Sequence, residues 1–250
     1  MDAAVDIVIK LGLLLVLLGL TCLSSTWALL RGLNPRGVVL VGSATLAIFF
    51  GALFFMIQTS APAGSTPLFQ KYFDEAWDHQ TQWLKTQGVP EDRVSQGKVF
   101  YQKYIVQSFP AWLAVNCLVV GLLAYYLSSA LLSKVTTRVT KAIAFREWLI
   151  PESLVFGLIL GAILKLGFKE DGFLDILGNN LLVFFVGLYG LGGLSIVSFF
   201  LNKWRVPAFF RILCYLPLFY LMSEFICTLG VLDVWFDFRK IKTAAPEQTA

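Results

Sequence analysis

Two ionisable side chains, Lys165 and Glu224, lie within long apolar stretches of the chain. A charged group is costly inside a bilayer, so each of these positions is a candidate for function. Lys165 follows Glu152 by 13 residues and Glu224 follows Arg211 by the same number, which corresponds to about 20 Å of helix. These equal depths suggest a Lys165–Glu224 pair, either purely structural or part of a binding site. The alternative is that Lys165 extends to the interface beside Lys169, with Glu224 protonated or hydrated in a cavity.

The fifth apolar stretch carries further polar residues, Asn179, Asn180 and Tyr189. It also contains the run GLYGLGG (187–193), whose small residues permit close packing between membrane helices. Together with Lys165 and Glu224, these polar residues are candidate ligand-binding positions. Helix packing is the favoured role of the glycine run, because it lacks the strand–turn–helix context of a nucleotide-binding loop.

The C-terminal segment LDVWFDFRK (232–240) contains two carboxylates, Asp233 and Asp237, four residues apart. On one face of a helix such a pair could bind a divalent metal cation, as in membrane enzymes that act on lipid phosphates. Trp235 and the basic residues that follow favour the other interpretation, in which the segment caps a helix and anchors it at the interface. The sequence has no Ser/His/Asp set, HExxH or Walker motif, so we expect no catalytic residues, no cofactor and no enzymatic activity.

The composition of the chain indicates the solvent in which these residues lie. Hydrophobic residues make up 57% of the 250 residues and charged residues 14%, whereas soluble domains carry about 25% charged residues. Such a chain cannot cover a water-exposed surface, so we expect a lipid bilayer as its partner and no nucleic acid. The four cysteines lie in apolar stretches without metal-ligand spacing, which predicts buried hydrophobic positions: Cys22, Cys117, Cys214 and Cys227.

Six apolar stretches approach or exceed the length needed to cross the roughly 30 Å hydrocarbon core of a bilayer. They are residues 11–30, 38–57, 104–133, 153–168, 176–202 and 207–232. The fourth is the weakest because Lys165 interrupts it, and the third must tilt or extend beyond the core. The acidic flank of the first stretch favours a retained helix over a signal peptide. The expected fold is therefore all-α, a polytopic membrane helix bundle of about six transmembrane helices in a single membrane domain (1–250).

Lysine and arginine gather in the short links after the first, third and fifth stretches. These links, residues 31–37, 133–151 and 202–211, hold nine basic residues and one acid, Glu147. Short basic loops stay on the cytoplasmic side of a membrane. The distribution therefore predicts that these loops are cytoplasmic and that both termini lie outside.

The one sizeable polar segment, residues 58–107, lies between the second and third stretches. Thr66 is placed to cap a first amphipathic helix, which Gly88 would end. Pro90 and the acidic residues Glu91 and Asp92 predict the start of a second helix that runs towards Pro110. We expect an extracytoplasmic helical hairpin that lies on the membrane surface or caps the bundle. It could also act as a lid over a cavity or as a docking site for a partner.

Four segments of the chain carry a family resemblance: ALLRGLNPRGVVLVGSATL (28–46), FREWLIPESLVFGLILGAIL (145–164), NNLLVFFVGLYGLGGLSIVSFFLNKWRVPAFFRIL (179–213) and LGVLDVWFDFRK (229–240). They resemble the YybS-like family of bacterial integral membrane proteins, a domain of unknown function. The most specific parts are the FREW-x-x-P and LDVWFDFRK motifs. Members usually carry further hydrophobic segments before the equivalent of Leu11, so the resemblance implies that these helices are the C-terminal part of a larger bundle.

The resemblance implies a multi-pass protein of the bacterial cytoplasmic (inner) membrane. It extends distantly to the substrate-binding S components of energy-coupling-factor transporters, and it supplies no catalytic or ligand residues. With the polar positions above, it gives a leading hypothesis of transport-related binding of a small molecule among the last three spans. A second hypothesis is a scaffold or assembly factor for the cell envelope that docks a membrane protein partner on the external hairpin. The third is an intramembrane lipid-processing enzyme that uses Asp233 and Asp237.

Overall fold

The computed structural model describes residues 3–59, 68–136, 142–170, 172–221 and 223–241, which form helices and links without a strand. The all-α class predicted from the sequence is thereby confirmed. The chain divides into two compact units, Met1–Ala142 (unit 1) and Ile143–Ala250 (unit 2). The single membrane domain over 1–250 stays a prediction.

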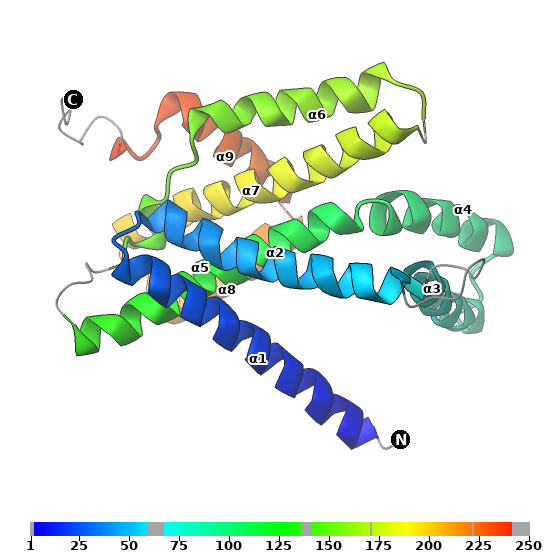
Figure 1. Ribbon diagram of the computed structural model, residues 1–250. Coiled ribbons are helices and arrows are strands. Elements are labelled where there is room, and N and C mark those ends of the chain that lie inside the picture. Colours follow the sequence, from blue (N-terminus) through cyan, green and yellow to red (C-terminus); the bar gives the residue numbers. More distant parts are fainter. Residues whose placement is uncertain (1–2, 60–67, 137–141, 171, 222, 242–250) are drawn as a thin grey trace. The chain divides into compact units, whose positions relative to one another are not determined.

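Three long helices pack together in unit 1 (Figure 1): α1 (Ala3–Leu30), α2 (Pro35–Thr59) and α5 (Phe109–Val135). Small residues line their contacts. A Cβ on Gly42 would lie 2.8 Å from Ser25 Oγ, and one on Gly121 would lie 2.9 Å from a backbone oxygen of α2. Ser128 Oγ on α5 donates a hydrogen bond to the Cys22 carbonyl oxygen at 3.1 Å. Close packing and interhelical hydrogen bonds of this kind hold helices together in lipid, where the hydrophobic effect does not.

The segment between α2 and α5 forms α3 (Leu68–Thr86), α4 (Glu91–Tyr101) and a π-helical turn, η1 (Gln102–Val106). Gly88, two residues after the end of α3, has a positive φ of 74°, and the Val89 N–H donates to a carbonyl oxygen of the last turn at 3.2 Å. Trp77 is buried, with its ring 5.0 Å from that of Tyr101 on α4. The predicted pair of helices with Gly88 between them is confirmed, whereas the predicted cap at Thr66 lies outside the described residues.

Unit 2 contains the 3₁₀ turns η2 (Phe145–Glu147) and η3 (Glu152–Leu154) and the helices α6 (Val155–Gly167), α7 (Phe173–Lys203), α8 (Ala208–Leu221) and α9 (Ser223–Phe236). α6 and α7 lie side by side and antiparallel (Figure 1). A Cβ on Gly178 would lie 2.6 Å from the Lys165 backbone nitrogen, and one on Gly161 would lie 3.1 Å from the Leu182 nitrogen. Glycines at these two positions therefore allow the backbones of α6 and α7 to approach each other closely.

The glycine run of α7 is a contact surface for α9. A Cβ on Gly193 would overlap the Ile226 carbonyl oxygen, and a Cβ on Gly230 would overlap the carbonyl oxygen of Tyr189. The backbones of the two helices therefore touch where they cross, which a larger side chain at either glycine would prevent. The helix-packing role favoured for this run from the sequence is confirmed.

Three of the described helices are long and apolar enough to cross a membrane: Pro35–Met56 within α2, Phe109–Val135 and Phe173–Lys203. They match the second, third and fifth predicted spans. α6 has 13 residues and is about 20 Å long, which is shorter than the hydrocarbon core. The predicted sixth span, 207–232, is divided between α8 and α9, each of 14 residues. Residue 222, which lies between these two helices, is outside the described residues, so the sixth span and the total of six full-length spans stay predictions.

Candidate functional site

Lys165 pairs with Asp175 across the short link between α6 and α7, with 2.7 Å between Nζ and Oδ1. The Asp175 side chain is 2% exposed and that of Lys165 is 20% exposed, so water screens this pair weakly. Asp175 also lies in the first turn of α7, where the helix dipole stabilises an anion. This pair corrects the hypothesis of a Lys165–Glu224 pair, because a carboxylate on the adjoining helix already neutralises the ammonium group.

A second buried ion pair joins Arg239 to Asp233, with 2.6 Å between Nη2 and Oδ2. The two side chains are 2% and 6% exposed, respectively. Arg239 Nη1 donates to Ser195 Oγ at 2.6 Å and to the Arg146 carbonyl oxygen at 2.9 Å. Ser195 Oγ donates in turn to the Phe145 carbonyl oxygen at 2.7 Å. One guanidinium group thus connects η2, α7 and the segment that follows α9.

The carboxylates of Asp233 and Asp237 do not share a helix face, because α9 ends before Asp237 and that residue has a positive φ of 40°. Asp233 accepts from Arg239 at Oδ2 and from the Phe238 N–H at Oδ1, the latter at 2.9 Å. Asp237 accepts the Ile241 N–H at 3.1 Å. Both side chains therefore make the capping contacts favoured by the sequence. The described residues contain no group of three His, Cys, Asp or Glu side chains that could hold a metal ion.

The two buried ion pairs contact α7 near its opposite ends: Asp175 belongs to one pair, and Ser195 binds Arg239 of the other. Asp175 and Ser195 are 20 residues apart on this helix, which corresponds to about 30 Å. The hydrocarbon core of a bilayer is also about 30 Å thick. If α7 spans the membrane, the pairs lie near its two interfaces, where charged groups cost least.

A groove of about 390 Å³ opens between α7 and α9. It is lined by Val186, Ser223, Glu224, Cys227, Thr228 and Val231. Val186 lies 11 residues from Asp175 and 9 from Ser195 on α7, so it is about 16 Å and about 14 Å from them along the helix. The groove therefore lies about midway between Asp175 and Ser195 along α7.

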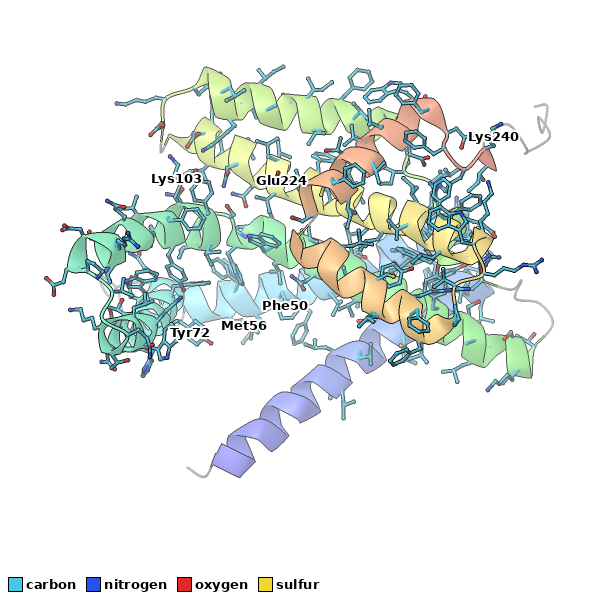
Figure 2. All side chains as sticks on the ribbon, turned by 180° about the vertical axis from the view of Figure 1, so that it is seen from behind. Phe50, Met56, Tyr72, Lys103, Glu224 and Lys240 are labelled. Atoms are coloured by element: carbon cyan, nitrogen blue, oxygen red, sulfur yellow. The ribbon has the colours of Figure 1, made fainter. Side chains whose placement is uncertain are left out.

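Glu224 lies in the first turn of α9, where this helix meets α8. Figure 2 shows the two helices leaving this junction in different directions. In the part of the chain that the structure describes, the Glu224 carboxylate has no hydrogen-bond or ion-pair partner. The dipole of α9 favours a negative charge at this end of the helix. A single anionic group bordering a largely apolar groove is suited to binding a cation with a hydrocarbon part.

The other predicted ligand-binding residues do not line this groove. Asn179 is buried on α7, and Asn180 Nδ2 donates to the Ile176 carbonyl oxygen of its own helix at 2.9 Å. Tyr189 is 0% exposed at the crossing of α7 and α9, and its hydroxyl group has no partner among the described residues. Of the five predicted residues, Glu224 alone borders the groove.

Two partners of the buried charges, Asp175 and Ser195, were not among the site residues predicted from the sequence. Asp175 follows Lys165 by ten residues across a short polar link, and this spacing could have identified the pair. Cys227 and Thr228 follow Glu224 at i+3 and i+4, which is the spacing of one helix face. No local pattern points to Ser195, which lies 44 residues from Arg239.

No curated protein and no solved structure matches the chain. A family model described as "Predicted membrane protein (DUF2232)" matches residues 4–234. This range extends from α1 through most of α9 and includes the groove and the Lys165–Asp175 pair. Because the match covers most of the chain, the protein belongs to this family of predicted membrane proteins.

Proposed function

We propose that the protein binds a small organic cation in the groove beside Glu224, in a transport-related and non-enzymatic role. The observation that carries this proposal is a carboxylate that borders a groove of about 390 Å³ and has no partner within the described residues. Pockets for small molecules have volumes of roughly 300–1,000 Å³, mostly apolar walls and a few polar groups. The groove has this size and this lining.

The charge of the ligand follows from the cost of placing in a membrane a carboxylate that has no partner within the described residues. Insertion measurements place the cost of an aspartate at the centre of a helix at roughly 2.5–3.5 kcal/mol. The cations of the two buried ion pairs in unit 2, Lys165 and Arg239, are already neutralised by Asp175 and Asp233. A bound cation supplies the missing charge, and its hydrocarbon part contacts the apolar wall.

The position of Glu224 supports transport over other roles. Secondary transporters bind their substrates near the membrane midplane, often where a helix is broken. If α7 spans the membrane, Glu224 lies near the midplane, because it lines one groove with Val186, and it begins α9 close to the end of α8. The sequence likeness to YybS-like proteins, and distantly to transporter S components, agrees with this proposal.

A thermal-shift measurement on the purified protein tests the proposal, with benzyltrimethylammonium as the cation and neopentylbenzene as its neutral isostere. We expect the cation alone to raise the unfolding temperature. Glu224→Gln should abolish this shift, whereas Glu91→Gln, which removes an exposed carboxylate of unit 1, should retain it. Equal shifts in wild type and Glu224→Gln would refute the proposal.

Cys227 gives a second readout, because it lines the groove. In a variant whose other cysteines are replaced by alanine, we expect benzyltrimethylammonium to slow alkylation of Cys227. The same protein carrying Glu224→Gln should show no protection. Alkylation that proceeds at one rate with and without the cation counts against occupancy of the groove.

We further propose that the chain lies in a bacterial inner membrane with its basic loops in the cytoplasm. Nine basic residues in three short links support this orientation; two of them, Arg138 and Lys141, lie outside the described residues. A membrane-impermeant maleimide should label Glu91→Cys in intact cells and should label Arg36→Cys only after the cells are opened. The reverse pattern would invert the proposed orientation.

A further inference from the structure

We infer that α3 lies in the lipid headgroup layer, with the face that carries Tyr72 and Trp83 directed towards the bilayer. These side chains are 70% and 60% exposed in the described chain. They are 11 residues apart, close to three helical turns, so they project from the same side of α3. Ala76 and His79 lie between them on this face.

The other two sides of α3 have different surroundings. Phe73 and Trp77 face α4, where their rings lie 6.2 Å and 5.0 Å, respectively, from that of Tyr101. Asp74 and Asp78 lie on the remaining side with other charged residues. The side with Phe73 and Trp77 is thus occupied by α4, and the side with the aspartates is suited to water. The side with Tyr72 and Trp83 is left for a partner that has both apolar and polar groups.

The placement of α3 relative to α2 and α5 identifies that partner as the bilayer surface. Both helices are apolar enough to cross a membrane. Figure 1 shows α3 nearly end-on where α2 and α5 are seen from the side, so α3 runs across their ends. Figure 2 shows Tyr72 on the side of α3 that adjoins Met56, near the end of α2. The aromatic face therefore points back towards the membrane that these helices enter.

The chemistry of the face suits lipid headgroups. Tyrosine and tryptophan have an apolar ring and a polar tip, and they are enriched where hydrocarbon meets water. The segment 58–107 carries five basic and five acidic residues, so attraction to anionic lipid does not explain its attachment. Burial of the aromatic rings in the headgroup layer explains the attachment. It predicts that salt does not weaken the association of α3 with the membrane.

Spin-label accessibility in nanodiscs of phosphatidylcholine tests this inference on the full chain. A cysteine-free background receives Tyr72→Cys or Trp83→Cys, with Asp74→Cys and Asp78→Cys as matched controls on the charged side. We expect the ratio of oxygen to nickel-chelate accessibility to be severalfold higher at 72 and 83 than at 74 and 78. Unchanged melting temperatures identify the variants that retain the fold.

Two results would overturn the inference. Equal accessibility ratios at all four positions would mean that both sides of α3 lie in water. Protection of positions 72 and 83 from both reagents would mean that protein, from this chain or a second copy, covers the face. Because neither measurement involves Glu224, the inference can fail while the proposed cation binding stands.

Discussion

Replacement of Arg239 by methionine should strongly destabilise unit 2. The substitution removes the guanidinium group that neutralises Asp233 and leaves that carboxylate with the Phe238 N–H, which donates to it at 2.9 Å. It also removes the donor to Ser195 Oγ and to the Arg146 carbonyl oxygen. An uncompensated charge then stays in a site that is almost closed to water.

The size of the effect follows from the burial of this pair. Loss of one partner of a buried ion pair costs about 3–5 kcal/mol, and the side chains of Arg239 and Asp233 are 2% and 6% exposed. In a chain of this length each kcal/mol corresponds to roughly 2–4 °C in melting temperature. The expected decrease is therefore about 6–20 °C.

Thermal unfolding in detergent or nanodiscs measures this decrease, and a double substitution sharpens the result. Arg239→Met with Asp233→Leu should recover most of the loss, because apolar residues can replace a buried ion pair at little cost. Lys71→Met is the matched control: it breaks a pair with Glu75 whose side chains are 63% and 62% exposed, and should cost less than about 1 kcal/mol. The reasoning is wrong if Arg239→Met is no more destabilising than Lys71→Met.

Three further predictions address packing, pairing and pH. Gly193→Val should separate α7 from α9 and lower the melting temperature, at a cost of about 1–3 kcal/mol or more, whereas Gly51→Ala, with open space around it, should be tolerated. Lys165→Met should destabilise the protein equally in wild-type and Glu224→Gln backgrounds, and a coupling above about 0.5 kcal/mol would contradict the assigned partner. Burial, reinforced by a nearby aspartate, raises the pKa of Tyr101 above its ordinary 10.0. Its contribution to stability is therefore complete below pH 10.0 and is lost as the pH rises through the folded-state value; comparison of phenolate absorbance with Tyr101→Phe should show this late titration.

The helices between α2 and α5 could be predicted from the sequence because their signals are local. Gly88 ends α3 by adopting a positive φ, a conformation that costs glycine little. Acidic residues at the start of α4 mark the next helix, which begins at Glu91. The packing role of the glycine run of α7 could also be predicted, since small residues on the surface of a membrane helix indicate close packing.

The partners of the buried charges could not be predicted in the same way, because they depend on where helices end. A continuous helix through 232–240 would place Asp237 one turn after Asp233 and carry Arg239 away from it. Instead, Asp237 has a positive φ of 40°, which turns the chain at the end of α9 and brings Arg239 to Asp233. Residues other than glycine seldom adopt a positive φ, so this turn could not be predicted from the sequence.

Glu224 differs from the paired acids of unit 2 in the sign of the stability change expected on its removal. Neutralising Asp175 leaves Lys165 without its partner and should lower the melting temperature. Glu224→Gln instead removes a charge that has no partner among the described residues, so the ligand-free variant should be more stable than the ligand-free wild type. Saturating benzyltrimethylammonium should close this gap, because binding at 100 times Kd adds about 2.7 kcal/mol, close to the roughly 2.5–3.5 kcal/mol that a central carboxylate costs. A Gln variant less stable than the ligand-free wild type would show that Glu224 serves folding, and the cation proposal would lose its physical basis.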